Sequence, residues 1–459
     1  MLVGAGGCRW VHRVSMKKRR KSKVSRPKGE LFKQLGWLAP GLGVKRWLAP
    51  ILLGTSLIGV GLAVVFLDIY RNAPETWWLP VLSAASLRVF SRPVRALIFG
   101  LLGIALILWG VGGLNRSLLA PYRRPGHPVL DELTLHRKLE RGPKIVALGG
   151  GHGLSVLLRG LKNFTYNLTA VVTVADDGGS SGRLRRSLGM LPPGDIRNCL
   201  AALSNDETLL SQLFQYRFPS GESGLEGHSF GNLFIFALSE IMGSFEEAVA
   251  ESGRVLSVHG RVLPATLHDV RLVADVALPF AVSEVRVEGE SHIPEFPGKV
   301  SRIWLEPNNP PAYPQVIQAL LGADLIVMGP GSLFTSVLPN LLVPDIGAAV
   351  RASRALKIFV CNLTTQPGET DGFTCEDHVR VILDHVGEGL FDLIVVNSSQ
   401  EALLPENHEW VRVEEELDNQ YALYRADLVD VEQPSRHNGE KLSKVLMDLL
   451  QERTGPLVE

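Results

Sequence analysis

The stretch Lys144–Gly153 reads KIVALGGGHG and decides the fold. Its apolar run, Ile145–Leu148, predicts a short buried strand. Three glycines follow at once, and leucines at helical spacing then predict a helix that begins near Gly153. Glycine lets a backbone approach a ligand closely, and the amide groups at a helix start attract anions such as phosphate. The stretch therefore predicts a strand, a turn and a helix, with the turn either cradling a phosphate or serving only as a tight connection.

The same order of strand, turn and helix recurs after Gly153. Continuous apolar strands that alternate with helices predict an α/β fold with a mostly parallel sheet, covered on both faces. The section Pro264–Pro297 reads as strands with few helices, which predicts an inserted antiparallel element. Further strands are predicted at Leu168–Ala175, Val262–Leu267, Arg271–Leu278, Val300–Leu305, Asp324–Met328, Lys357–Asn362 and Phe391–Asn397, and helices at Glu207–Tyr216, Ser229–Met242, Phe245–Glu251, Tyr313–Leu321, Glu376–His385 and Lys441–Gln451.

The part of the chain before Pro143 has a different composition. Residues 1–46 are rich in lysine and arginine and predict a disordered basic tail. Two uncharged apolar runs follow at about 47–67 and 96–115, and each has the length of about 20 residues that spans a bilayer. They predict a transmembrane hairpin over 47–115, with a buried helix pair of a soluble domain as the alternative. A proline-rich linker at 116–142 then leads to the domain at 143–459.

The distribution of charge predicts how this hairpin lies in the membrane. The basic tail, together with arginines after the second run, places both termini and the 143–459 domain in the cytoplasm by the positive-inside rule. We therefore expect a multi-pass protein of the inner (cytoplasmic) membrane, whose basic tail contacts lipid and not nucleic acid. Met16 offers a second translation start that would keep the basic block. The four cysteines contain no CxxC pair, which fits a reducing compartment and neither a zinc site nor a disulfide framework.

Two adjacent carboxylates, Asp176 and Asp177, follow the second predicted strand in the stretch DDGGSSGR. Carboxylates at a strand end bind Mg²⁺ or a ribose hydroxyl, and Arg183 supplies charge for a phosphate. A polar surface loop is the alternative. A dehydrogenase with a dinucleotide-binding fold also places an acid here, but GGGHG lacks the G-x-G-x-x-G spacing, which weakens the case for NAD.

Two further motifs carry polar groups at predicted helix starts. The stretch PPGDIRN predicts Asp195 as a helix N-cap, and a ligand role for Asp195 and Asn198 is an equal alternative. The stretch GHSFGN opens an apolar helix and places Asn232 in its first turn. His228 in this stretch is better explained as a structural histidine than as a general acid or base.

A second strand–glycine–helix unit reads GPGSLFTS from Gly329, with Gly331 in the turn and Ser332 as the predicted helix cap. Its first-turn amides would point at an anion. Two such units in one sheet fit a ligand with two phosphates, or with a phosphate and a sugar. Neither unit has the lysine of a Walker A loop, which argues against an ordinary ATPase.

Six motifs, GGGHG, DDGGSSGRLR, PPGDIRN, GHSFGN, GPGSLFTSVLPNLLV and TQPGETDG, occur in this order. The chain resembles the gluconeogenesis factor (YvcK/CofD-like) family within the 2-phospho-L-lactate transferase-like superfamily. The resemblance implies a Rossmann-like three-layer sandwich that binds a nucleotide-linked sugar, typically UDP-N-acetylglucosamine. It also implies a role in cell shape and wall precursor flux during gluconeogenic growth. The related transferases use a GDP-linked donor and Mg²⁺ to move a phospholactyl group onto a deazaflavin alcohol.

Two functions of different class follow from these motifs. The favoured one is a regulator that binds a UDP-sugar without catalysis, forms homo-oligomers and signals to a protein partner. The alternative is a phospholactate-type transferase with Mg²⁺ on Asp176 or Asp177. In the regulator, we expect the diphosphate to lie on Gly150, Gly151 and Gly153, and the ribose or a metal to lie on Asp176 and Asp177. The sugar or second phosphate would lie on Asn232, Gly331 and Ser332. Arg183 would be a phosphate clamp or a subunit contact.

Overall fold

The structure is a computed structural model that describes residues 138–204, 209–219, 224–278, 283–296 and 298–454, with isolated positions between 55 and 105. The chain divides into two compact units, Met1–Glu132 and Leu133–Glu459. The predicted basic tail, most of both predicted spans and most of the linker lie outside the described residues. Among the residues that are described, no single helix has the length and apolar composition to cross a membrane, and one bent helix pair, Leu333–Leu341 with Pro344–Ala352, meets both criteria together.

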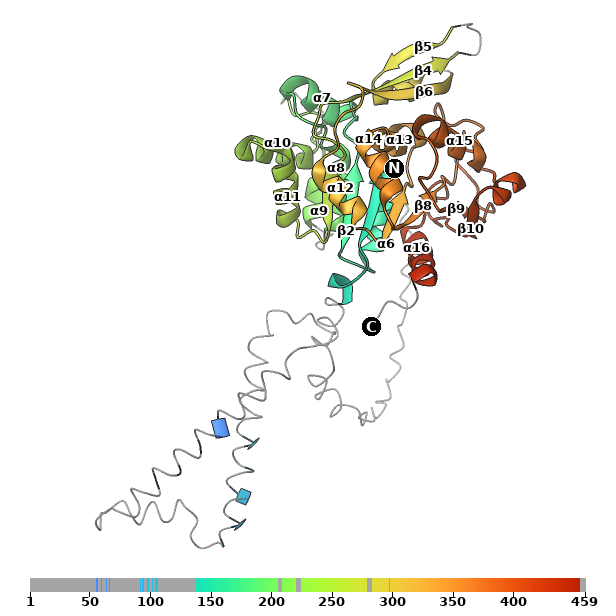
Figure 1. Ribbon diagram of the computed structural model, residues 1–459. Helices are drawn as coiled ribbons and strands as arrows, with labels where there is room; N and C mark the ends of the chain where they lie inside the picture. The colour runs from blue at the N-terminus through green and yellow to red at the C-terminus, as the bar shows by residue number, and fades with distance from the viewer. Residues whose placement is uncertain are drawn as a thin grey trace, which may run out of the picture. The chain divides into compact units, whose positions relative to one another are not determined.

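Seven parallel strands form the central sheet of the second unit, in the order β10-β9-β8-β7-β1-β2-β3 (Figure 1). The chain runs from β1 outward to β2 and β3, and it then returns to β7 beside β1 before moving outward to β10. The strand order therefore reverses between β1 and β7, and ligands of open parallel sheets bind at the carboxyl ends of strands at such a point. The strands are β1 (Ile145–Gly149), β2 (Leu168–Val172), β3 (Arg261–Pro264), β7 (Leu325–Met328), β8 (Leu356–Val360), β9 (Leu393–Asn397) and β10 (Ala422–Ala426).

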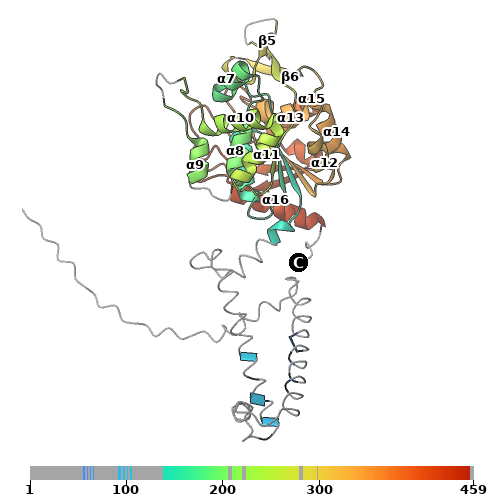
Figure 2. The ribbon, with the colours of Figure 1, turned by 90° about the vertical axis from the view of Figure 1, so that its left-hand side faces the viewer.

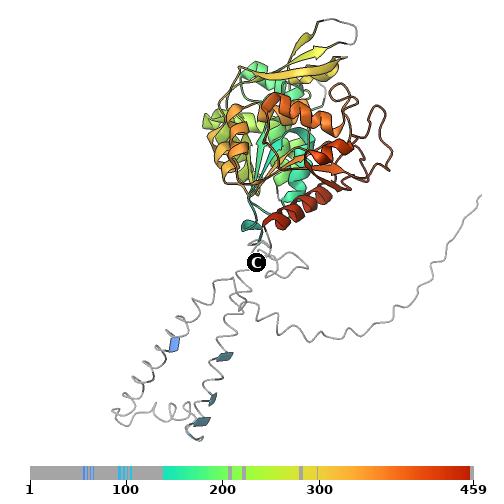
Figure 3. The same cartoon turned by 45° about the vertical axis from the view of Figure 1, so that its right-hand side comes forward.

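Helices cover both faces of this sheet, as Figures 1 and 3 show. Helix α6 (Gly151–Leu161) packs between α8 (Gly194–Leu203) and α16 (Gly439–Thr454), while α12 (Pro314–Leu321) packs beside α14 (Pro344–Ala352) on the other face. Every residue of β1, β2 and β7 is buried, which is the expected consequence of a sheet with two covered faces. The predicted α/β fold with a mostly parallel sheet is thus confirmed.

A separate sheet of three antiparallel strands lies at one end of the unit (Figures 1 and 2). Its order is β5-β4-β6, from β4 (Arg271–Ala277), β5 (Val285–Glu288) and β6 (Lys299–Glu306). The predicted antiparallel insertion is confirmed, and it extends beyond Pro297 to Glu306. A short 3₁₀ helix, η3 (Glu290–Glu295), lies between β5 and β6 in the chain.

The remaining helices surround the carboxyl ends and flanks of the main sheet. Most predicted helices begin and end within a few residues of their observed bounds. Strand β10 was missed because it is a half-exposed edge strand with no continuous apolar run. Helix α14 was missed although it begins at a proline, which is favourable at the first helical position. The remaining helices are α7 (Gly179–Leu188), α9 (Leu209–Gln215), α10 (Phe230–Met242), α11 (Phe245–Val255), α13 (Leu338–Leu341) and α15 (Cys375–Val386), with a π-helical turn at Leu333–Val337 and a 3₁₀ turn at Glu415–Asn419.

Candidate functional site

The two predicted glycine turns lie side by side at the point where the strand order reverses. Leu148 pairs with Met328, so the turns after β1 and β7 begin next to each other. Gly151 has a φ of +60°, a conformation that glycine adopts without strain. A Cβ added to Gly153 would lie 2.5 Å from the Pro330 carbonyl oxygen, so the first turn of α6 packs directly against the second glycine turn.

A pocket of about 420 Å³ opens between these turns, a size that is typical of small-molecule sites. Ser332 caps the helix that follows it, because its Oγ accepts a hydrogen bond of 3.2 Å from the Thr335 amide, as predicted. The Ser332 hydroxyl also donates to the Glu369 carboxylate. Burial raises the pKa of Glu369. The pocket is lined by residues of both turns and by Thr364, Gln366, Glu369, His408, Arg436 and His437, among others.

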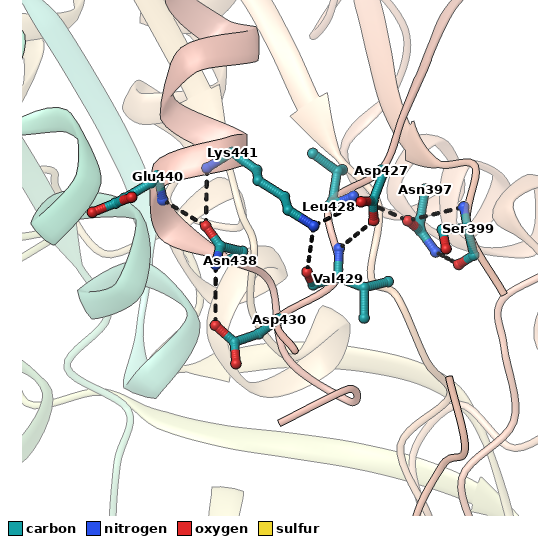
Figure 4. A network of polar contacts seen from close by, with 9 residues as sticks. All are labelled: Asn397, Ser399, Asp427, Leu428, Val429, Asp430, Asn438, Glu440 and Lys441. Atoms are coloured by element: carbon teal, nitrogen blue, oxygen red, sulfur yellow. Dashed lines mark hydrogen bonds and ion pairs between the residues drawn. The ribbon is translucent and has the colours of Figure 1, made fainter. Parts of the chain in front are cut away.

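The wall with Arg436 and His437 comes from a turn at 427–441 that a polar network holds in place (Figure 4). Lys441 Nζ donates to Asp427 Oδ2 at 2.6 Å and to the Val429 carbonyl at 3.0 Å. On the other side of the turn, the Asp430 amide donates to the Arg436 carbonyl at 3.1 Å. These contacts fix the backbone from which the Arg436 side chain reaches the pocket.

Asp195 reaches the first glycine turn and not the start of its own helix. Helix α8 begins at Gly194 with Pro193 in the cap position, so the prediction that Asp195 is an N-cap is wrong. Inside the first turn, the Asp195 side chain is free to cross to Gly150, where an added Cβ would lie 2.5 Å from Asp195 Oδ2. The nearby Gly151 amide favours the ionised form of the Asp195 carboxylate. Asp195 therefore lies beside one of the amides that were expected to bind phosphate.

Three partly buried carboxyl groups, those of Asp176, Asp195 and Glu290, lie close enough beside this turn to repel one another. Burial, strengthened by repulsion from Asp176, raises the pKa of Asp195 to about 6. Burial and the charges of Asp176 and Asp195 raise the pKa of Glu290 to about 8. Burial also raises the pKa of Asp176. Such a cluster favours a bound proton, a cation or the hydroxyl groups of a sugar, all of which relieve the repulsion.

The adjacent carboxylates Asp176 and Asp177 have different partners. Asp176 Oδ1 accepts a hydrogen bond of 2.9 Å from the Gly178 amide. Asp177 Oδ1 accepts one of 2.9 Å from the Ser291 amide, which ties η3 of the inserted sheet to the site. Within the described ranges, no group of three side chains of the types that bind metals is arranged around a common point. Mg²⁺ commonly binds one or two carboxylates together with substrate phosphates, and Asp176 fits that role.

A polar wall links α7 to the start of α10. Asn232 lies in the first turn of α10, as predicted, and its Nδ2 donates to Ser180 Oγ at 3.1 Å. The buried Asn232 Oδ1 has no hydrogen-bond partner in the part of the chain that the structure describes. Arg183 Nε donates to His228 Nε2 at 3.3 Å, and its NH2 group donates to the Glu226 carbonyl at 2.9 Å. These contacts support a structural role for His228.

Known proteins match this chain over most of its length. The family model of 2-phospho-L-lactate transferase CofD matches residues 145–433. The gluconeogenesis factor of Bacillus subtilis is 46% identical over 325 residues, which cover 68% of this chain and 99% of the relative. The chain belongs to the gluconeogenesis factor family of CofD-like proteins. A relative from Nostoc sp., provisionally described as a gluconeogenesis factor, is 47% identical over 454 residues, or 94% of this chain and 95% of its own.

A solved structure of this gluconeogenesis factor family has the same domain. The crystal structure of a UPF0052 protein from Bacillus halodurans is 44% identical and superposes with a TM-score of 0.63. The match covers 67% of this chain and 99% of that chain. A free-standing protein thus corresponds to the second unit alone, which shows that a domain of this kind folds without the first 132 residues.

In this gluconeogenesis factor family member, the sequence analysis missed Arg197 as a site residue. The Arg197 side chain is buried, and its Nε and NH1 atoms have no hydrogen-bond partner among the described residues. Its NH2 group donates to Asn198 Oδ1 at 2.9 Å, so Asn198 orients it. Burial and the nearby charge of Arg217 lower the pKa of Arg197 to about 10. A buried guanidinium with unused donors is suited to an anion, and its position two residues after Asp195 in PPGDIRN was the available signal.

Proposed function

We propose that the protein is a regulator that binds a nucleotide-linked sugar of the UDP-N-acetylglucosamine type between the two glycine turns. The pocket at the reversal of strand order carries this proposal, because it joins backbone amides, a cation and sugar-binding groups in one space. Amides of Gly150 and Gly153 and the guanidinium of Arg436 suit the diphosphate. Glu369 and Gln366 suit sugar hydroxyls, and the buried Gln366 Oε1 has no partner in the described part of the chain.

A polar region that begins at Asp195 beside Gly150, outside the residues that line the pocket, suits the nucleoside. Asp176 and Asp195 would accept hydrogen bonds from ribose hydroxyls, which relieves their mutual repulsion without adding a charge. The unpaired oxygen of Asn232 would accept from the base or the sugar. Relatives described as gluconeogenesis factors support a role in growth on gluconeogenic carbon, and we extend it to cell shape and wall precursor flux.

A transferase is the second candidate, supported by the description of the matching family and by the acidic cluster. An acceptor hydroxyl oxygen would form a bond to phosphorus while the bond to the nucleotide leaving group breaks, and the leaving group takes the electron pair. Asp195, with a pKa of about 6, would accept the hydroxyl proton. When bound, Mg²⁺ would neutralise phosphate charge beside Asp176. Arg197 would orient the donor.

We also propose that the uncharged runs at 47–67 and 96–115 anchor the domain to the cytoplasmic membrane with its pocket in the cytoplasm. The match to the Nostoc relative over 94% of this chain supports a shared arrangement that includes an N-terminal region. Fractionation of cells that express the full chain, with a protease-accessibility assay on sealed vesicles, tests this location. Release of the protein into the soluble fraction would contradict it.

Calorimetric titration of the Leu133–Glu459 unit tests both functions. The ligands are UDP-N-acetylglucosamine, GDP, NAD and ATP, each with and without Mg²⁺, and each mixture is then analysed for turnover. Selective binding of the UDP-sugar, with the ligand recovered intact, supports the regulator. GDP binding that needs Mg²⁺, or a donor that is consumed, supports the transferase. A preference for NAD contradicts both.

A further inference from the structure

A short segment of the inserted sheet, the 3₁₀ helix η3, contacts two separate loops of the site. The first contact is with the loop after β2. The Ser291 amide donates to Asp177 Oδ1 at 2.9 Å, and a Cβ added to Gly178 would lie 3.5 Å from the Ser291 Cβ. The start of η3 is therefore held against the loop that carries the two adjacent carboxylates.

The end of η3 contacts a second loop, which follows β8. Gly368 in this loop has a φ of +79°, and a Cβ added to it would clash with the Pro294 carbonyl. Gly368 lies between Gln366 and Glu369, which both line the pocket beside the glycine turns. We name residues 289–296 the η3 strap. The strap joins the loop after β2 to the loop that carries Glu369.

Glu290 lies on the η3 strap and is close to carboxylates of both loops. Burial and nearby negative charge raise the pKa of Glu290 to about 8. The charges that act on it include those of Asp176 and Asp195 and, from the second loop, that of Glu369. Asp195 lies beside Gly150, and Glu369 lines the pocket, so both neighbourhoods belong to the site. The strap therefore brings a polar side chain between two parts of the site.

The body of the inserted sheet and the η3 strap are attached differently. The Ile303 amide of β6 donates to His385 Nε2 of α15 at 3.0 Å, which holds the sheet against the main domain. The strap begins at Gly289, which has a φ of +100°, and Gly298 follows its end. A hollow of about 770 Å³ borders residues 294–296. Because glycines absorb large changes in backbone angle, the strap can swing at its ends while the sheet stays in place.

We propose that the η3 strap is a lid that closes over the bound nucleotide-sugar and opens for the ligand to enter and leave. This inference rests on the proposed function, which assigns a nucleotide-linked sugar to the pocket beside the strap. Lids of this kind exclude water from a site, and their opening commonly sets the rate of release. With the strap closed, Glu290 would contact the ligand, whose hydroxyl groups would relieve the repulsion among the carboxylates.

A disulfide between the strap and the loop after β2 tests the lid. The 3.5 Å between the two Cβ positions suits a disulfide in the double variant Gly178→Cys/Ser291→Cys. Oxidised glutathione forms this disulfide in the Leu133–Glu459 unit, dithiothreitol breaks it, and mass spectrometry verifies both states. With the disulfide formed, the association and dissociation rates of UDP-N-acetylglucosamine, measured by surface plasmon resonance, should both fall at least about tenfold. The reduced double variant and the single variant Ser291→Cys are the controls and should keep rates close to the wild type.

Hydrogen exchange without ligand separates a failure of the lid from a failure of the proposed ligand. Opening of the strap exposes the Ser291 amide, so a peptide that contains residues 289–296 should exchange at least about tenfold more slowly once the disulfide has formed. Exchange that the disulfide does not slow would overturn the lid. So would unchanged binding rates with the disulfide formed. Slower exchange in a unit that binds no UDP-N-acetylglucosamine in either state would support the mobile strap and overturn the nucleotide-sugar as its ligand.

Discussion

Gly153 and Pro330 are in backbone contact across the reversal of strand order: a Cβ added to Gly153 would lie 2.5 Å from the carbonyl oxygen of Pro330 and 3.1 Å from the Cα of Gly331. The neighbouring atoms belong to the backbone and cannot rotate away, as a flexible side chain would. The separation of the two glycine turns, and with it the width of the pocket floor, is therefore set by the absence of a side chain at Gly153.

Gly153→Ala should force the two turns apart. We expect the free energy of unfolding to fall by about 1–3 kcal/mol, as in other overpacked sites, and ligand affinity to fall with it. Urea unfolding and calorimetric titration measure the two effects. Gly253→Ala is the control: it also lies in a helix, and its added Cβ would meet no atom closer than 3.7 Å. Equal losses in both variants would contradict the role of the contact.

Asn340 joins the same two regions through hydrogen bonds. Its Nδ2 donates to the Gly149 carbonyl at 2.9 Å and to the Ser336 carbonyl at 2.8 Å, and the residue is fully buried. Asn340→Ala should lower the free energy of unfolding by about 1–3 kcal/mol, because buried carbonyls lose a donor. Urea unfolding checks this. The exposed Asn163→Ala should change stability little, and a similar loss there would point to a general effect of removing asparagine.

Glu290 should make stability depend on pH. Its pKa is raised from 4.5 to about 8 in the folded domain, so its protonated form stabilises the folded state below the unfolded pKa, and this contribution is lost as pH rises through about 8. The side chain in Glu290→Gln cannot ionise. Between about pH 5 and about pH 8.5, the free energy of unfolding should therefore fall less in this variant than in the wild type. At about pH 8.5 the free energy of unfolding of the variant should be higher than that of the wild type by at least about 1 kcal/mol.

The exposed Glu288 on β5 provides the comparison, since Glu288→Gln should keep the pH dependence of the wild type. Urea denaturation at several pH values gives all three curves. Parallel curves for the wild type and Glu290→Gln would show that Glu290 does not titrate in this range.

The polar network of Figure 4 should affect ligand binding more than stability. Arg436→Ala removes a cation that lines the pocket, and we expect at least about a tenfold loss of affinity for the UDP-sugar. Lys441→Met releases Asp427 and the Val429 carbonyl, which loosens the turn that carries Arg436, and should cost less affinity than Arg436→Ala. Lys444→Met, exposed one turn further along α16, should bind normally. Unchanged affinity for the UDP-sugar in Arg436→Ala would show that this wall of the pocket does not contact the ligand.

Local sequence signals predicted the parts of the site that depend on one segment. The glycine turns at Gly150 and Gly331, the cap at Ser332 and the place of Asn232 in α10 each follow from a few neighbouring residues. The prediction for Asp195 was wrong because the helix of PPGDIRN begins at Gly194, and only the packed structure shows the Asp195 carboxylate crossing to Gly150.

The missed residues depend on contacts between distant segments. Glu290 reaches the acidic cluster because Asp177 holds the Ser291 amide, a contact across 114 positions. Arg436 reaches the pocket because a network beyond β10 fixes its turn. No sequence pattern near Glu290 or Arg436 indicates these partners. Periodicity and motif spacing therefore predicted the sheet and its layers, but only part of the site.

The pocket joins Gly150, near the start of the domain, to Arg436 and His437 close to its end. The ribosome synthesises these parts of the pocket in that order. The part with Arg436 and His437 is held in place only after Lys441 and the rest of α16 have been synthesised. A chain still held on the ribosome with α16 in the exit tunnel would have the first glycine turn but an unfinished pocket. Ligand capture would then report that α16 has left the exit tunnel, and ligand present in the cell could stabilise each new molecule only from that point onward.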